Sequence, residues 1–242
     1  MQAHPDDEVF ATGAATCVLS DAWWRVVMRV ATAGVGAAAD RLDASCDLLG
    51  IHEWDWLGDK DRWLDDGGSS GPGTLASSDI GEIAGEIEVS IGELQPELIL
   101  TVGRDGLTGH PDHIAVAQAV QRAVQDQPCL ALGARLATQD VQVGRQLLQQ
   151  LLPGEQVGSG RVIGCTTALQ EIAGSPEVGV RRRKALDLYY DGLGTQDIAE
   201  LVTTYGRRGD SLLLRAVFDA STWHRDRFEV LSSSGTAAPS FP

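Results

Sequence analysis

The residues with the clearest capacity for chemistry lie in two similar turns, HPDD beginning at His4 and HPDH beginning at His110. Proline is favoured at the first position of a helix, because its fixed φ suits the helix and its missing N–H needs no partner there. We therefore expect a helix to begin at each turn. Side chains three residues apart on a helix lie close together, which pairs His4 with Asp7 and His110 with His113.

The HPDD turn alone also fits a purely structural role, because free N–H groups and the helix dipole favour acidic residues in a first turn. The second turn favours a metal site instead, since three of the five histidines of the chain lie in the two turns. Three nitrogen and oxygen ligands with one position left for water are typical of catalytic zinc, whereas structural zinc is usually enclosed by cysteines.

The elements that must position these turns alternate between apolar, β-branched runs and segments of helical period. This pattern is typical of βα units around a parallel sheet, in which ligands collect at the carboxyl ends of strands. The strands that we predict are 24–32, 51–57, 97–102, 130–137 and 161–167. The helices that we predict are 36–49, 79–94 with Asp79 as N-cap, 111–125, 140–152, 177–188 and 195–206.

Three polar segments are expected to lie outside the core. Residues 58–78 form a long Gly-rich loop, which fits either a lid over a site or a tolerated insertion. The run RRRK at 181–184 is interpreted as a solvated helix face rather than as a site for an anionic substrate group. Residues 232–242 contain few large apolar side chains, and we expect a disordered tail there.

The composition excludes several classes of protein. Over 242 residues the formal net charge is −15, and such a surface repels nucleic acid and anionic lipid. The four cysteines show no CxxC spacing, which argues against a disulfide framework. No stretch reaches the roughly 20 apolar residues of a membrane span, and no signal segment opens the sequence. We expect a cytoplasmic enzyme without a membrane partner; a homo-oligomer is compatible with the sequence.

The two turns together carry a resemblance to a known family. AHPDDE near the start, with HPDH about a hundred residues later, resembles the PIG-L/LmbE family of zinc-dependent N-deacetylases, which act on N-acetylglucosamine-type substrates. The resemblance covers residues 1–126 and is looser over residues 127–231. It implies an α/β, Rossmann-like fold in which a mostly parallel sheet is flanked by helices. We expect residues 1–231 to form a single domain, with the metal site in residues 1–126.

The resemblance also implies roles for individual residues. His4, Asp7 and His113 match the ligands of a Zn²⁺ cofactor, and Asp6 matches the general base that takes a proton from a zinc-bound water. His110 matches a histidine that, when protonated, stabilises the oxyanion or assists the leaving amine. Two further assignments follow in the same way: Asp112 would orient the imidazole of His110, and Arg41 is the nearest candidate for binding substrate hydroxyls.

The sequence departs from the family at its start. Family members carry a hydrophobic strand directly before AHPDDE, in the middle of the sheet, whereas only Met1, Gln2 and Ala3 stand there. We therefore expect the first strand to be missing or truncated. The substrate implied is a small N-acetylated amino sugar or conjugate. An amidase of larger amide conjugates and a non-catalytic sugar-binding or scaffold protein are the alternatives.

Overall fold

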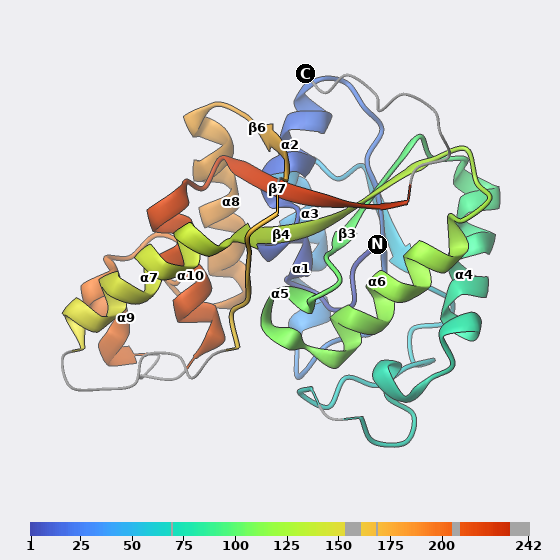
Figure 1. The fold of residues 1–242 in the computed structure, drawn as a ribbon, viewed down its shortest axis with the longest axis horizontal. Helices are drawn as coiled ribbons and strands as arrows, with labels where there is room; N and C mark the ends of the chain where they lie inside the picture. Colours follow the sequence, from blue (N-terminus) through green and yellow to red (C-terminus); the bar gives the residue numbers. More distant parts are fainter. Residues whose placement is uncertain (69, 153–160, 168, 205–208, 233–242) are drawn as a thin grey trace.

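A two-stranded and a five-stranded group of β-strands, joined through residues 1–3 into one mixed β-layer, lie between two layers of helices and form the body of the molecule (Figure 1). The computed structural model describes all residues except 69, 153–160, 168, 205–208 and 233–242, so the predicted tail lies almost wholly outside the described residues. The strands are β1 Val27–Val30, β2 Glu53–Trp56, β3 Leu98–Val102, β4 Leu130–Ala137, β5 Gly164–Cys165, β6 Gln170–Ala173 and β7 Arg225–Ser232. The α-helices are α1 Asp7–Phe10, α2 Gly13–Asp21, α3 Leu42–Leu49, α4 Ile80–Leu94, α5 Gly106–Gly109, α6 Pro111–Ala123, α7 Thr138–Leu151, α8 Pro176–Tyr189, α9 Ile198–Thr204 and α10 Asp210–Ser221, with short 3₁₀ turns at Ala38–Arg41 and Leu75–Ser77.

The sheet is parallel in the half that carries the two turns and mixed beyond it. β1 pairs with β2, β3 with β4, and β4 with β5, all in parallel. β7 is antiparallel to both of its neighbours, β4 and β6. The predicted α/β sheet flanked by helices is therefore confirmed, and the sheet is mixed because β7 enters it from the opposite end.

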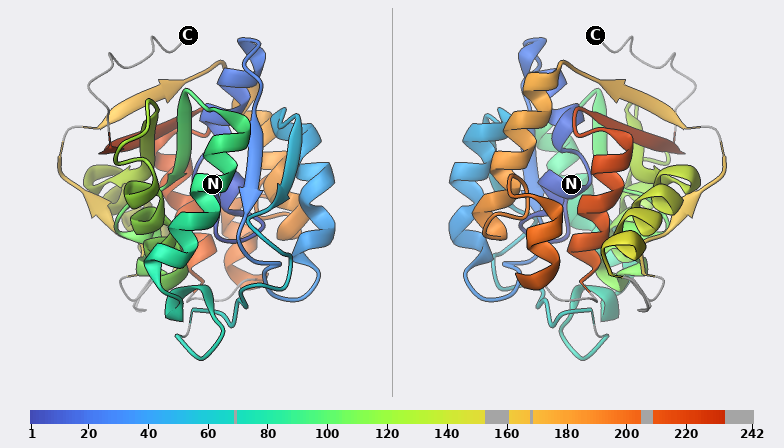
Figure 2. Two further views of the ribbon diagram at one scale, coloured as in Figure 1. Left: turned by 90° about the vertical axis from the view of Figure 1, so that its right-hand side faces the viewer. Right: turned by 90° about the vertical axis from the view of Figure 1, so that its left-hand side faces the viewer.

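Each face of the sheet buries its own apolar layer. Along β4, alternate residues serve opposite faces, because side chains of a strand point alternately up and down: Leu132 is in one core and Ala131 in the other. Helices α4 and α6 cover the second face, while α1, α2, α3, α7, α8 and α10 supply the first (Figure 2). Among the described residues, none of the helices is both long and apolar enough to cross a membrane.

The basic run on α8 differs from our prediction at one residue. The side chain of Arg182 is completely buried, so the interpretation of RRRK as a solvated face is wrong at that position. Its guanidinium donates to the carbonyl oxygens of Val9 and Phe10, each at 2.8 Å, and forms an ion pair of 2.9 Å with Asp226 on β7. Arg182 thus ties the carboxyl end of α1 to the sheet, because a buried charge must be paired and hydrogen-bonded.

Residues 1–3 occupy the centre of the sheet, between β1 and β3. Gln2 donates its backbone N–H to Arg29 O at 2.9 Å and accepts from Ala31 N–H at 3.0 Å, so it pairs in parallel beside β1. On the other side, the α-amino group of Met1 donates to Leu100 O on β3 at 2.9 Å. The place that the family resemblance assigns to a central strand therefore holds three residues.

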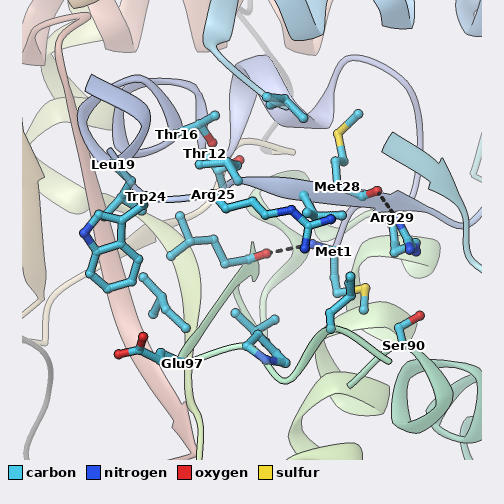
Figure 3. Close-up of a pocket in the computed structure, with 18 of the residues that line it drawn as sticks. Met1, Thr12, Thr16, Leu19, Trp24, Arg25, Met28, Arg29, Ser90 and Glu97 are labelled. Carbon is cyan, nitrogen blue, oxygen red and sulfur yellow. Dashed lines mark hydrogen bonds between the residues drawn. The ribbon is translucent and has the colours of Figure 1, made fainter. Parts of the chain in front are cut away.

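A cavity of about 570 Å³ continues the line of these three residues between β1 and β3. Its walls include Val27 and Met28 from β1 and Leu98 and Ile99 from β3, and Met1 is among the residues that line it (Figure 3). Burial lowers the pKa of the Met1 amine from 8.0 to about 5; the charge of Asp7 opposes this change and the charge of Arg29 adds to it. The volume of the cavity and its lining from β1 and β3 would accommodate an extended segment added at Met1.

We expect a short apolar β-strand sequence fused to Met1 to raise the thermal midpoint of unfolding by several degrees. The fused peptide bond replaces a buried amine with an amide N–H that keeps the bond to Leu100, and the new side chains fill the cavity. At this chain length each kcal/mol shifts the midpoint by about 2–4 °C. The measurement is a melting curve, compared with an equally long extension that contains alternate prolines.

The free amine adds a pH signature to this experiment. Between pH 5 and 8 the unfolded chain protonates the amine and the folded chain does not, so the amine makes stability increase with pH over that interval. We expect the extended protein to lack this contribution. Equal midpoints of thermal unfolding for the apolar and the proline-containing extensions would contradict the prediction that the cavity between β1 and β3 accepts an added strand.

Candidate metal centre

The HPDD turn places its two acidic side chains in different environments. Helix α1 begins at Asp7, two residues later than Pro5, where the sequence predicted it. Asp7 turns back, and its Oδ2 accepts the backbone N–H groups of Ala3 at 3.1 Å and His4 at 2.9 Å. Asp6 has a φ of 103°, a left-handed conformation in which aspartate is more common than most residues. The two carboxylates have different hydrogen-bond partners.

The HPDH turn follows the predicted local structure. Helix α6 begins at Pro111, with His110 in the extended N-cap conformation. The imidazole of His113, one turn into the helix, donates from Nδ1 to the carbonyl oxygen of Gly106 at 2.9 Å. A carbonyl oxygen only accepts, so this bond leaves the Nε2 of His113 with a free lone pair.

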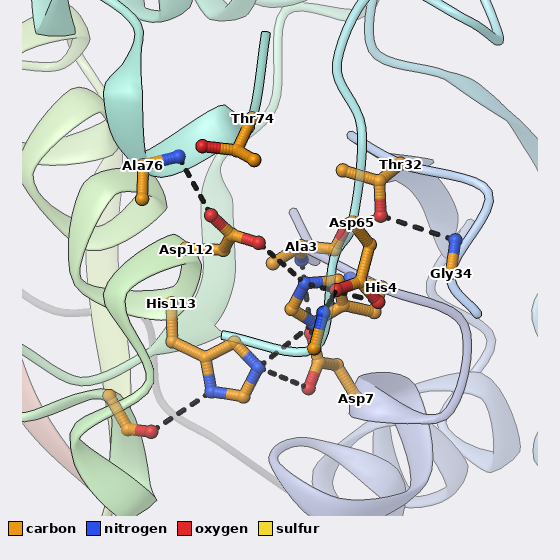
Figure 4. A network of polar contacts seen from close by, with 12 residues as sticks. Ala3, His4, Asp7, Thr32, Gly34, Asp65, Thr74, Ala76, Asp112 and His113 are labelled. Carbon is orange, nitrogen blue, oxygen red and sulfur yellow. Dashed lines mark hydrogen bonds and ion pairs between the residues drawn. The ribbon is translucent and has the colours of Figure 1, made fainter. Parts of the chain in front are cut away.

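The two turns meet beyond the carboxyl ends of the central strands. His113 Nε2 lies 3.2 Å from His4 Nδ1 and 3.0 Å from Asp7 Oδ1, and His4 Nδ1 lies 3.6 Å from Asp7 Oδ2 (Figure 4). All three side chains are buried. The structure thus brings together the three predicted ligands, from segments about 110 residues apart in the chain.

The hydrogen bonds around the two imidazoles orient His4 Nδ1 and His113 Nε2 toward one another. His4 Nε2 lies 3.1 Å from Asp112 Oδ2, and an ionised carboxylate only accepts, so Nε2 carries a proton. With His113 protonated on Nδ1, its Nε2 lone pair faces His4 Nδ1 across 3.2 Å, beside the carboxylate of Asp7. A positive charge between these atoms stabilises the arrangement, either a second proton on His4 or a metal ion in its place, so the donor set fits a divalent metal ion.

The ionisation behaviour of the cluster supports the same conclusion. Burial disfavours the charged form of His4, but the hydrogen bonds with Asp112 and Asp7 outweigh it and hold its pKa well above 6.5. Burial also opposes ionisation of Asp7, yet the charge and hydrogen bonds of His113 and His4 keep its pKa well below 3.8. The cluster therefore attracts positive charge strongly.

Asp6 has its own partner, which the sequence did not reveal. The hydroxyl of Tyr190, directly after α8, donates to Asp6 Oδ2 at 2.7 Å. Burial first, and then the charges of Asp7 and Glu8, raise the pKa of Asp6 well above 3.8. Asp6 is thus a carboxylate with increased proton affinity next to the donor set, and Tyr190 occupies one of its two oxygens.

His110 lies beside the donor set without the partner that we predicted. Asp112 contacts His4 through Oδ2 and accepts the backbone N–H of Ala76 at 2.7 Å through Oδ1, so the pairing of Asp112 with His110 is wrong. Among the described residues, none forms a hydrogen bond with the buried Nδ1 of His110. Burial, together with the charges of His113 and His4, lowers the pKa of His110 to about 4. The ring is therefore neutral at pH 7 before substrate binds.

The loop at residues 58–78 lies against the site, which favours its interpretation as a lid. Asp65 places Oδ2 3.8 Å from His4 Nε2, and the backbone of Gly68 lies so close to His110 that a Cβ there would approach Nε2 to 3.2 Å. Ala76 supplies the N–H that holds Asp112. Polarity and glycine content identified the loop, but its contacts depend on packing.

Arg41 makes one contact that the structure specifies, from Nε to the carbonyl oxygen of Leu188 at 3.2 Å. It is an exposed residue at the end of the 3₁₀ turn before α3. Its role in substrate binding stays a prediction.

The fold and the site define a class of protein, an α/β protein with a buried cluster of His and Asp side chains, able to hold a metal ion, beyond the carboxyl ends of its central strands. Within that class, the chain belongs to the PIG-L family: the family model described as GlcNAc-PI de-N-acetylase matches residues 1–124. The resemblance inferred from AHPDDE and HPDH is therefore confirmed.

Relatives in the family carry deacetylase names. The 1D-myo-inositol 2-acetamido-2-deoxy-alpha-D-glucopyranoside deacetylase of Thermobifida fusca is 28% identical over 226 residues, which cover 79% of this chain and 77% of that protein. The protein of the same name from Thermobispora bispora is 30% identical over 151 residues, covering 52% of this chain and 50% of its own length.

Solved structures with the same fold also include deacetylases. The A40926 pseudoaglycone deacetylase aligns with a TM-score of 0.61 at 16% identity, covering 95% of each chain. The N,N′-diacetylchitobiose deacetylase of Pyrococcus horikoshii aligns with a TM-score of 0.54 at 14% identity, covering 95% of this chain and 81% of that chain. At these identities the two alignments support the fold alone.

Proposed function

We propose that this protein is a zinc-dependent N-deacetylase that removes the acetyl group from an amino sugar or an amino-sugar conjugate. The observation that carries the proposal is the convergence of His4 Nδ1, Asp7 and His113 Nε2, with both imidazole tautomers held by hydrogen bonds. Tetrahedral zinc with bonds of about 2.0–2.2 Å separates its ligands by roughly 3.3–3.6 Å, close to the distances in this cluster. Family membership and the names of the relatives support the same reaction.

Each residue of the site has a task in this reaction. A zinc ion held by His4, Asp7 and His113 would supply Lewis-acid chemistry and lower the pKa of a coordinated water from 15.7 toward about 7. Asp6 accepts a proton from the attacking water, for which its raised pKa suits it. His110, neutral before substrate binds, donates a hydrogen bond to the developing oxyanion, or it first takes up a proton from solvent and then passes that proton to the leaving amine. Asp112 holds the tautomer of His4.

A panel of N-acetylated sugars, their conjugates and bulkier amides tests the proposal through the primary amine released. We expect zinc-loaded protein to release amine from at least one N-acetyl amino sugar and metal-depleted protein to release none. Turnover of the bulkier amides alone would favour an amidase of larger conjugates. Sugar binding without turnover by protein that holds zinc would favour a non-catalytic role.

Replacing Tyr190 by Phe is expected to lower kcat by ~10–100-fold, with KM and zinc content nearly unchanged. The change removes only the hydroxyl that positions Asp6, and a hydrogen bond to a charged group contributes about 1.5–3 kcal/mol. Tyr189→Phe is the matched control, because the Tyr189 hydroxyl donates to Glu8 at 2.7 Å instead. Equal losses of kcat in the two variants would show that Tyr190 has no particular effect on Asp6.

A further inference from the structure

The turn between β3 and the HPDH segment contains a strained residue. Strand β3 ends at Val102, and residues 103–109 connect it to His110, the N-cap of α6. Within this turn Leu107 has φ 60° and ψ −47°, close to the γ-turn of positive φ, which is rare and strained. Its side chain is buried. A residue stays in such a conformation only where its surroundings impose it.

The same turn presents a backbone carbonyl to the metal ligand His113. The carbonyl oxygen of Gly106 accepts from His113 Nδ1 at 2.9 Å, and this bond leaves Nε2 for a metal ion. Gly106 has a φ of 66°, and a Cβ there would lie 3.1 Å from the Cβ of His113. The orientation of the imidazole therefore depends on where the turn holds Gly106.

Asp105 fixes the turn on both sides of Gly106. Its Oδ1 accepts the backbone N–H of Leu107 at 3.0 Å, and its backbone carbonyl accepts the N–H of Gly109 at 3.0 Å. An aspartate side chain that accepts the N–H two residues further on stabilises a tight turn. The strained conformation of Leu107 is thus held by a side chain that contacts neither the metal ligands nor the base.

The Asp105 carboxylate is in turn fixed by the sheet. Its Oδ2 forms an ion pair with Arg135 Nε of β4 at 2.9 Å, and the two side chains are 12% and 13% exposed. The two atoms meet without hydrogen-bond geometry. Arg135 donates to Glu229 of β7 at 2.8 Å, and the same oxygen of Glu229 accepts the backbone N–H of Arg104 at 2.8 Å. A continuous set of contacts therefore joins β4 and β7 to the turn.

We propose that Asp105 is a positioning residue for the metal ligand His113. The assignment rests on the zinc site of the proposed function, but not on the reaction that the zinc serves. Without the Asp105 oxygen, Leu107 loses the partner that holds its positive φ, and the turn relaxes. The Gly106 carbonyl then moves away from His113, and the imidazole loses the bond that directs Nε2 to the metal.

The zinc affinity of the metal-depleted full chain, measured by competition with a chelator, tests this assignment. We expect Asp105→Ala to weaken zinc binding by ~10-fold, as is usual when a partner of a metal ligand is disturbed. Asp105→Asn keeps an oxygen that accepts the Leu107 N–H, and it should restore most of the wild-type affinity. Asp105→Glu keeps the charge but carries its oxygens one methylene farther from the backbone, so it should lose affinity as Asp105→Ala does.

Asp197→Ala is the matched control. Asp197 Oδ1 accepts the N–H of Ala199 at 2.8 Å, which is the same kind of bond, at the start of α9 and away from α5 and α6 (Figure 1). This variant should keep the wild-type zinc affinity.

Two results would overturn the assignment: wild-type zinc affinity in folded Asp105→Ala, or equal affinities in Asp105→Asn and Asp105→Glu. The second comparison decides the question even where Asp105→Ala does not fold. Zinc binding by the wild type without amine release from any substrate would refute the deacetylase proposal alone. Absence of zinc binding by the wild type would refute both proposals.

Discussion

Replacing Asp6 by Asn is expected to lower kcat by ~10²–10⁴-fold, the usual contribution of a general base, while the zinc content stays unchanged. The asparagine amide cannot accept the proton of the attacking water. Asp6 is not among the three converging donors, so the metal should stay bound. Steady-state kinetics and metal analysis of the same purified sample measure the two quantities together.

The conformation at this position makes Asn a suitable replacement. Asn, like Asp, tolerates the left-handed backbone that Asp6 adopts with a φ of 103°, and its side chain can still accept the Tyr190 hydroxyl. A loss of activity therefore reports on proton transfer rather than on folding. Full activity in Asp6→Asn would remove the assignment of Asp6 as the base.

Replacing His113 by Ala is expected to remove both the metal and the activity. The change deletes Nε2, which lies within 3.2 Å of both His4 Nδ1 and Asp7 Oδ1, so two donors are left for an ion that needs three protein ligands. Metal analysis after dialysis should give far less than one zinc per chain, and amine release should fall to the background of buffer.

His52→Ala is the control for this change. His52 is an exposed imidazole whose Nδ1 accepts the backbone N–H of Val26, far from the two turns in the sequence. It should keep zinc and activity. Retention of about one zinc by His113→Ala would mean that the ion is held by other residues.

Several elements were predictable because their signals are local. Helix α4 has the predicted N-cap, Asp79, whose side chain accepts from Gly81 N–H at 2.7 Å. Strand β4 has the predicted bounds, since a run of apolar residues between polar segments marks a buried strand. The predicted strand 161–167 survives only as the two residues of β5.

Strand β7 is an element that the sequence did not indicate, because its polar residues find their partners far away in the chain. Strand β7 reads RDRFEVLS, in which Asp226 is buried like the apolar Phe228. Asp226 belongs there because Arg182, on another element, forms an ion pair with it and the backbone N–H of Ala15 donates to it at 2.9 Å. A charge pattern that only long-range partners satisfy carries no local strand signal.

The sequence by itself indicated two His-Pro-Asp turns with the capacity to bind a metal, because histidine and aspartate three residues apart at a helix start lie close together, and the resemblance carried by these turns implied His4, Asp7 and His113 as the donor set. Only the tertiary structure decided that Asp112 supports His4 rather than His110, that Tyr190 holds Asp6, and that Asp65 reaches the site. These contacts join residues 61–184 positions apart. Their partners depend on how whole helices and loops are packed, which no local pattern of residues specifies.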